Sequence, residues 1–165
     1  MAKGVRYPRW IEKFFENVYE LKKLKRKGWV RKAKIRNAET VAAHSYGVAL
    51  LSMILSDLKG YDTEKTLKMA LLHDLSESLV GDLMPEEISK QEKASRENEA
   101  MEKILSKLPK KLRTKYFKLW KELQEEKSKE AKLVKKVDKL DMKLQALFYS
   151  KEFKERKQLL KEFLE

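Results

Sequence analysis

Residues 70–82, ALLHDLSESLVGD, combine the apolar character of a core helix with side chains that bind metals or protons. The polar members of this run are His73, Asp74, Ser76, Glu77 and Asp82. The spacing of its leucines predicts a helix that ends at Gly81. On such a helix His73, Asp74 and Glu77 lie within about one turn of one another. Three ligating groups therefore converge on a part of the chain expected to be core.

The rest of the chain also has helical periodicity. Apolar residues recur at helical spacing almost throughout and no stretch shows the sustained alternation of a strand, so an all-α fold is expected. Helices are expected to begin near Pro8, Thr40, Asp62 and Ser128, and after Pro85 and Pro109, with a short one in the tail. Gly28 is expected to end the first helix. The last long helix is expected to turn inward Val134, Val137, Leu140, Leu144 and Leu147. No linker or repeat divides the chain, so one domain spanning residues 1–165 is expected.

The chain has only two histidines, and both fall on the inward side of an expected helix. His44 heads the apolar face of the helix expected over residues 40–58, and Asp138 interrupts the apolar face of the last long helix. A lone histidine among apolar residues is more often a hydrogen-bonded core residue than a ligand. Two inward histidines with several carboxylates change that balance, because each carboxylate buried without a cation costs several kcal/mol. A divalent metal supplies the compensation.

Composition narrows the chemistry of such a site. The chain has no cysteine, which excludes disulfides, thiolate nucleophiles and cysteine-bound zinc. Any metal must therefore be held by histidines and carboxylates. The start, MAKGVRYPRW, lacks the apolar block of a secretory signal, and we expect no run of roughly 18 apolar residues that spans a bilayer. A cytoplasmic protein without a membrane partner is expected.

The net charge of +13 is concentrated near the N-terminus, where residues 1–36 hold thirteen Lys or Arg and three Glu. Two interpretations stay open. This segment is either a solvated, lysine-rich surface or a charged face that attracts phosphate compounds or nucleic acid.

Four strings of the sequence, GWV, ETVAAHSYGVAL, ALLHDLSESLVGDLMPEE and EAKLVKKVDKLDM, carry a family resemblance. In order and spacing they resemble the 5′-deoxynucleotidases of the bacterial YfbR type and their eukaryotic HD-domain-containing relatives, within the HD superfamily of metal-dependent phosphohydrolases. The specific part is HD-x-x-E-x-x-x-x-G-D, with a histidine 29 residues before its His and an aspartate 64 residues after its Asp. The resemblance implies a compact HD-domain helical bundle of about six to eight helices.

The resemblance also implies a set of site residues. The family's metal ligands correspond here to His44, His73, Asp74 and Asp138. Glu77 and Asp82 match the family's acidic pair near the metal and are expected to position or activate water and to transfer protons. Asp141 lies three residues after Asp138 and could reach the same side of the helix, so two interpretations stay open: a carboxylate that supports the metal ligands, or an ordinary exposed carboxylate, which is favoured. Two imidazoles and two carboxylates leave one divalent metal ion neutral and open to water and a phosphate oxygen, and they favour cobalt or manganese, with magnesium, nickel or iron as alternatives.

The implied reaction is hydrolysis of deoxyribo- or ribonucleoside 5′-monophosphates, a small-molecule nucleotide substrate, to nucleoside and phosphate. Trp29 is expected either to stack on the base or sugar or to cap the core. In the bacterial type an arginine precedes that tryptophan, whereas this chain has Gly28, so Arg31 or Arg36 is expected to replace one phosphate contact.

Two other functions stay open. One is a mononuclear HD pyrophosphohydrolase acting on alarmone-type or other nucleotides. The other is a non-catalytic basic helical module that binds nucleic acid, although no zinc finger or helix-turn-helix pattern supports it. A homodimer is expected, because relatives dimerise and the helical pattern leaves Phe148 and Phe153 without an assigned partner.

Overall fold

The computed structural model describes residues 7–164, which form helices joined by short connections without a strand in that range. Its one β-type contact is an isolated antiparallel bridge between Lys25 and Thr40. The all-α prediction is therefore confirmed. The elements are α1 (Arg9–Lys23), α2 (Lys27–Arg31), α3 (Val41–Lys59), α4 (Thr63–Leu72), α5 (Glu77–Val80), α6 (Lys90–Ser106), α7 (Lys110–Gln124), α8 (Lys129–Glu152), the 3₁₀ turn η1 (Lys154–Arg156), α9 (Lys157–Leu160) and the 3₁₀ turn η2 (Lys161–Phe163).

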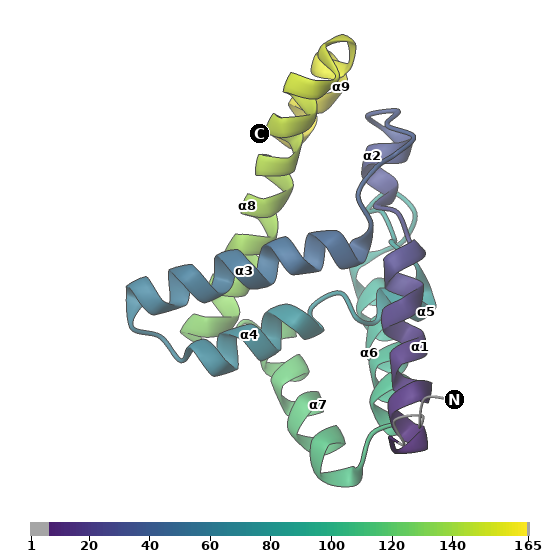
Figure 1. Ribbon diagram of the computed structural model, residues 1–165, viewed down its shortest axis with the longest axis vertical. Coiled ribbons are helices and arrows are strands. Elements are labelled where there is room, and N and C mark those ends of the chain that lie inside the picture. The colour runs from purple at the N-terminus through teal and green to yellow at the C-terminus, as the bar shows by residue number, and fades with distance from the viewer. Residues whose placement is uncertain (1–6, 165) are drawn as a thin grey trace, which may run out of the picture.

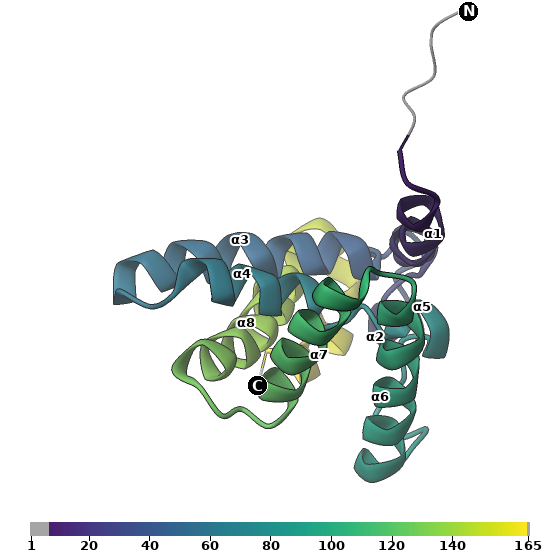
Figure 2. The same cartoon turned by 90° about the horizontal axis from the view of Figure 1, so that it is seen from below.

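Two groups of helices meet in the middle of the molecule. α3 and α4 lie side by side, and α8 crosses both of them (Figures 1 and 2). The second group consists of α1, α5 and α6, and α7 connects the groups by packing against α4, α6 and α8. The C-terminal elements η1, α9 and η2 pack back against α8. In this arrangement α3 is packed against α1, α4 and α8, which come from the beginning, the middle and the end of the chain.

The hydrophobic core of the described residues consists of three buried clusters, two of which share helix α3. Val41 belongs to the first cluster, with residues of α1, α4, α6 and α7. Val48 belongs to the second, with residues of α4, α7 and α8. The third joins Trp29 of α2 to Tyr149 of α8 and to the C-terminal segment. His44 lies one turn from both valines on α3, so it sits between the first two clusters.

The predicted helix starts are confirmed where a short polar side chain caps the helix. The side chains of Thr40, Asp62 and Ser128 accept hydrogen bonds from the first-turn backbone N–H groups of α3, α4 and α8. α3 ends at Gly60, which has a φ of 62°. Because this left-handed conformation favours glycine, the end of α3 is also local in origin.

The prediction of one continuous helix through residues 70–81 is wrong. α4 ends at Leu72, and a tight turn separates it from α5. The His73 Nδ1–H donates to the Ala70 carbonyl at 2.6 Å, and a continuing α-helix would use that carbonyl for the Asp74 N–H. The following backbone bonds have the shorter i→i−3 pattern, as from the Glu77 N–H to the Asp74 carbonyl at 3.0 Å. Leu79, one of the leucines whose spacing predicted the longer helix, is 43% exposed.

The prediction that the first helix ends at Gly28 is wrong. α1 ends at Lys23, and the chain continues in an extended conformation beside the segment that leads into α3. The Arg26 N–H donates to the Glu39 carbonyl at 3.0 Å, and the Val41 N–H donates to the Leu24 carbonyl at 2.8 Å. This pairing ends α1 before the glycine, which lies inside α2.

The inward face of α8 differs from the predicted one in its second half. Val134 and Val137 are buried as expected, but Leu140 and Leu147 are 39% and 40% exposed. Tyr149 is buried in their place. The cause is that α8 turns its aspartates, rather than its leucines, toward α3.

α3 has the length and hydropathy of a membrane-spanning helix, with a mean hydropathy of 1.4, which the sequence interpretation did not anticipate. A third of that apolar window is buried inside the protein. The buried side packs on α4 and α8 and carries His44, whereas a row of apolar residues on the other side is exposed: Tyr46, Leu50, Ile54 and Leu58.

Candidate metal centre

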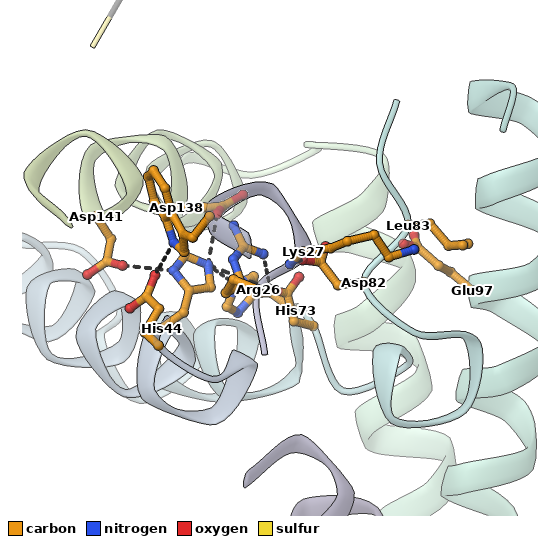
Figure 3. A network of polar contacts seen from close by, with 12 residues as sticks. Arg26, Lys27, His44, His73, Asp82, Leu83, Glu97, Asp138 and Asp141 are labelled. Carbon is orange, nitrogen blue, oxygen red and sulfur yellow. Dashed lines mark hydrogen bonds and ion pairs between the residues drawn. The ribbon is translucent and has the colours of Figure 1, made fainter. Parts of the chain in front are cut away.

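The two histidines of the chain face each other in the centre of the protein. His44 comes from α3 and His73 from the turn after α4, and they are 1% and 6% exposed. Their Nε2 atoms lie 3.3 Å apart (Figure 3).

The hydrogen bonds of the two Nδ1 atoms decide what the Nε2 atoms can do. The His73 Nδ1 lies 2.6 Å from the Ala70 carbonyl oxygen, which only accepts hydrogen bonds, so this nitrogen carries the proton. The His44 Nδ1 lies 2.7 Å from a carboxylate oxygen of Asp141 and donates to it. In the neutral rings the lone pairs of both Nε2 atoms then face each other. A cation bound between them would accept both lone pairs.

Two carboxylates complete this cluster. Asp74 Oδ2 lies 3.2 Å from the His73 Nε2 and 3.6 Å from the His44 Nε2, yet this buried oxygen makes no hydrogen bond. Asp138 Oδ1, from α8, lies 3.1 Å from the His44 Nε2. Within the described residues, ligand atoms of His44, His73 and Asp74 lie within 4.8 Å of one another. This donor set of imidazoles and carboxylates fits a divalent metal ion.

The electrostatic environment of the cluster favours positive charge. Burial lowers the pKa of His44, but its hydrogen bonds with Asp138 and Asp141 raise it to about 9. Burial raises the pKa of Asp74, but His73 and Arg26 bring it well below the ordinary value. Asp74 therefore stays ionised, which is the state that a metal ligand requires.

Glu77, at the start of α5, is a buried carboxyl group beside this cluster. It is 4% exposed, and its Oε2 has no hydrogen-bond partner. Burial, followed by the charges of Asp74 and Asp82, raises its pKa well above the ordinary value. Glu77 is therefore suited to hold a proton close to the histidine pair.

Asp82 lies just past α5 and is tied to the backbone of another segment. Its Oδ2 accepts a hydrogen bond from the Lys27 backbone N–H at 2.5 Å (Figure 3). This bond anchors the start of α2 next to the cluster. The structure thus gives Asp82 a positioning contact, while its expected part in proton transfer stays a prediction.

A cavity of about 360 Å³ opens beside the carboxylates. Its charged lining includes Arg26, Lys32, Lys93, Lys139, Asp74, Glu77, Asp82, Asp138 and Glu162. Its apolar lining comes from Trp29, Leu83, Met84, Pro85, Met142 and Phe163. A lining that combines charged groups with apolar surface suits a ligand with one anionic and one aromatic part.

Comparisons with known proteins fit this geometry. The model of the HD domain family matches residues 18–164. The chain belongs to the HD domain family. It is similar to the 5′-deoxynucleotidase HDDC2 of Homo sapiens, with 38% identity over 142 residues that cover 86% of this chain and 69% of the relative. The 5′-deoxynucleotidase HDDC2 of Dictyostelium discoideum is 42% identical over 147 residues, covering 84% and 77%. The crystal structure of the PH0347 protein from Pyrococcus horikoshii OT3 has a TM-score of 0.79 and 34% identity, covering 92% of this chain and 84% of that one.

Arg26 is a residue of this HD domain's site that the sequence interpretation missed. Its guanidinium lies 3.5 Å from Asp74 Oδ2, and its side chain is 16% exposed. Arg31, by contrast, is 59% exposed and pairs with Glu87, and Arg36 is exposed. Neither lines the cavity. The only signal for Arg26 was its membership of a basic run shortly before Gly-Trp.

Gly28, which departs from the arginine of the bacterial type, lies against the C-terminal segment. A Cβ atom at this position would meet the Phe163 ring at 3.3 Å, and the ring packs on Trp29 with centroids 4.3 Å apart. The place of a side chain at position 28 is thus taken by an aromatic ring from η2. The guanidinium instead reaches the HD domain's centre from Arg26.

Trp29 follows the core alternative of the two that the sequence left open. It is 2% exposed, and its Nε1–H donates to Glu39 Oε1 at 2.9 Å. Its ring packs edge-on against Tyr149, at 5.5 Å between centroids. Trp29 also lines the cavity, but its ring is packed mainly into the core.

Asp141 follows the less favoured of its two interpretations, because it supports a histidine of the cluster and is not an exposed carboxylate. Its side chain is 15% exposed and bonds to the His44 ring. The available signal was its spacing of three residues from Asp138, which places both aspartates on one side of α8.

Proposed function

We propose that this HD domain hydrolyses nucleoside 5′-monophosphates, deoxyribonucleotides above all, to nucleoside and inorganic phosphate. The observation that carries the proposal is the pair of buried Nε2 atoms, 3.3 Å apart, that face Asp74 and Asp138 beside an open cavity. Relatives at 38% and 42% identity that are named 5′-deoxynucleotidases support the same reaction class.

His44, His73, Asp74 and Asp138 would hold one divalent metal ion. Once bound, such an ion lowers the pKa of a coordinated water and neutralises charge that develops on the phosphoryl oxygens. We favour cobalt or manganese, because imidazole ligands suit these metals better than magnesium.

Glu77 would act as the proton donor of the reaction. Because burial and neighbouring carboxylates raise its pKa, it keeps a proton that an exposed glutamate would have lost. A proton delivered to the departing 5′-oxygen lets that oxygen leave as an alcohol. Asp82 would hold the start of α2 in place through its bond to the Lys27 N–H.

Arg26 would bind the phosphate of the substrate. Its guanidinium is already inside the cavity and beside Asp74, so little reorientation is needed for contact with a phosphate oxygen there. Planar guanidinium groups make paired hydrogen bonds to phosphate that a lysine ammonium does not make. Lys93 and Lys139 add positive charge to the cavity lining.

The nucleoside part would lie against the apolar wall of the cavity. Met142 and Phe163 contribute to this wall from α8 and η2. Apolar and aromatic surfaces of this kind hold bases without reading their hydrogen-bonding edges strongly. Broad base tolerance is therefore part of the proposal.

The active form would be a homodimer. The exposed apolar row on α3, formed by Tyr46, Leu50, Ile54 and Leu58, is the surface that we assign to the partner copy. Contiguous apolar surface of this kind on a helix is typical of protein interfaces. Phe153, which the sequence left unassigned, packs instead in the third core cluster.

The test is phosphate release from deoxyribo- and ribonucleoside 5′-monophosphates, a 3′-monophosphate and an alarmone, each with manganese, cobalt or magnesium. His73→Ala serves as the inactive variant, and Glu64→Ala, an exposed change on α4, serves as the matched control. Metal-dependent phosphate release confined to 5′-monophosphates and lost in His73→Ala is the expected result. Pyrophosphate release from the alarmone alone would favour the pyrophosphohydrolase. Salt-sensitive nucleic-acid binding that survives His73→Ala, without turnover, would favour the binding module.

A further inference from the structure

His44 is held at both ring nitrogens by aspartates of α8. The Nε2 lies 3.1 Å from Asp138 Oδ1, and the Nδ1 lies 2.7 Å from Asp141 Oδ2. Figure 3 shows Asp141 on one side of the imidazole and His73 on the other. The His44 side chain is fully buried, so no water competes for the Nδ1 proton.

Gly47 creates the space that Asp141 occupies. It lies on α3, three residues after His44 and therefore on nearly the same face. A Cβ atom built at this glycine would lie 2.2 Å from Asp141 Oδ1 and 3.2 Å from its Cγ. A glycine inside a helix costs about 1 kcal/mol relative to alanine, so helix stability alone does not explain it. The close approach of the Asp141 carboxylate does.

A second carboxylate, Glu39, lies in the same neighbourhood but is engaged differently. Ligand atoms of Glu39, His44 and Asp141 lie within 4.8 Å of one another. Glu39 Oε1, however, accepts the hydrogen bond of the Trp29 Nε1–H at 2.9 Å. Burial raises the pKa of Glu39, which opposes a second full negative charge at this edge of the ring. The hydrogen bond to the imidazole thus belongs to Asp141.

We propose that Asp141, seated in the gap left by Gly47, is a positioning residue that keeps the proton of His44 on Nδ1 and so turns the Nε2 lone pair toward the metal. A ligand histidine that donates its second N–H to a carboxylate is fixed in orientation and becomes a stronger donor. The inference rests on the metal site of the proposed function. Its tests measure metal binding and not turnover, so a failure of the inference about Asp141 can be told apart from a failure of the proposed function.

The first test is calorimetric titration of metal-free protein with manganese. Asp141→Ala should bind about 10- to 100-fold more weakly, the range found for such supporting carboxylates. Asp141→Asn keeps an oxygen that accepts the Nδ1–H, so its loss should be smaller. Glu39→Gln is the matched control: it removes the nearby carboxyl group but leaves an acceptor for Trp29, and it should bind manganese almost as the natural chain does.

Gly47→Ala tests the mechanism without removing the carboxylate. The added methyl group should push Asp141 away from His44 and weaken metal binding, while the helix itself gains stability. In the double variant Gly47→Ala/Asp141→Ala the methyl group has no carboxylate to displace, so binding should equal that of Asp141→Ala alone. Equal values in this cycle are the signature of a pathway through Asp141.

The second test is nitrogen NMR of the imidazoles in zinc-loaded protein, which is simple because the chain has only two histidines. In the natural chain both rings should carry the proton on Nδ1. Asp141→Ala should perturb the His44 pattern and leave that of His73, which bonds to the Ala70 carbonyl, unchanged. Unchanged manganese affinity in Asp141→Ala with an intact His44 Nδ1–H would overturn the inference. So would a second equivalent of bound manganese that disappears with Glu39→Gln, because the cluster would then be a metal site of its own.

Discussion

Replacing Arg26 by alanine is the most informative change to the proposed phosphate site. The guanidinium is 16% exposed and lies 3.5 Å from Asp74. Burial lowers its pKa, but the charges of Asp74, Asp82 and Glu77 more than compensate and raise the pKa above its ordinary value. Arg26 is thus a permanent cation at the end of the cavity where the substrate phosphate is proposed to bind.

The size of the effect follows from the contact that is lost. A hydrogen bond to a charged group contributes about 1.5–3 kcal/mol, and each 1.36 kcal/mol corresponds to about a tenfold change in rate, so kcat/KM should fall about 10- to 150-fold. Arg26→Lys keeps the charge but loses the planar pair of donors, so its loss should be smaller.

The assay is the initial rate on a deoxyribonucleoside 5′-monophosphate with manganese, with metal affinity measured in parallel. The parallel titration separates a lost phosphate contact from a disturbed metal site. Arg31→Ala provides the contrast, since Arg31 pairs with Glu87 on the surface. The reasoning is refuted if Arg26→Ala keeps its kcat/KM within the error of the assay while Arg31→Ala or Arg36→Ala loses most of it.

Three further changes test other parts of the proposal. Glu77→Gln should lower kcat about 100- to 10,000-fold with little change in KM. Because the raised pKa makes protonated Glu77 the active form, the natural enzyme should lose rate at alkaline pH as Glu77 ionises. If the variant shows the same loss of rate at alkaline pH, Glu77 is not the proton donor. Phe163→Ala should raise KM about 2- to 12-fold, with kcat retained, because an aromatic contact of about 0.5–1.5 kcal/mol is lost. Leu159→Ala, at an exposed position of the same C-terminal segment, should leave KM unchanged. Equal KM values for the two variants would show that Phe163 does not contact the nucleoside. Ile54→Glu should convert the dimer to a monomer in light scattering, whereas Val30→Glu, at another exposed apolar position, should not; a natural chain that is already monomeric would contradict the assigned interface.

Local signals in the sequence were sufficient for the main helices and for the four side chains that converge. Caps at Thr40, Asp62 and Ser128 mark helix starts because the capping bond forms within one turn of chain. The inward position of His44 followed from its spacing with apolar neighbours on α3. Short-range regularities of this kind survive folding because the tertiary structure does not oppose them.

The break at His73 could not be read from the periodicity. The spacing of the leucines continues through the turn, so a helical pattern persists where the helix does not. What ends α4 is the competition between the His73 ring and a backbone N–H for the Ala70 carbonyl. The same bond sets the tautomer of the His73 ring and directs its Nε2 toward His44.

The residues that the sequence missed depend on contacts between distant segments. The glycine at position 28 is explained only by the Phe163 ring that packs against it. The position of Arg26 in the site is explained only by the hydrogen bond from the Lys27 N–H to Asp82, which anchors the start of α2. The choice between the two interpretations of Asp141 was open for the same reason, because a pattern along α8 gives the spacing of its residues but not how the helix is rotated against α3. The absence of a side chain at Gly47 fits that rotation, because Asp141 of α8 occupies the space where a Cβ atom would lie. A glycine inside a helix, on the same face as a histidine, therefore indicates that another element approaches the ring at that point.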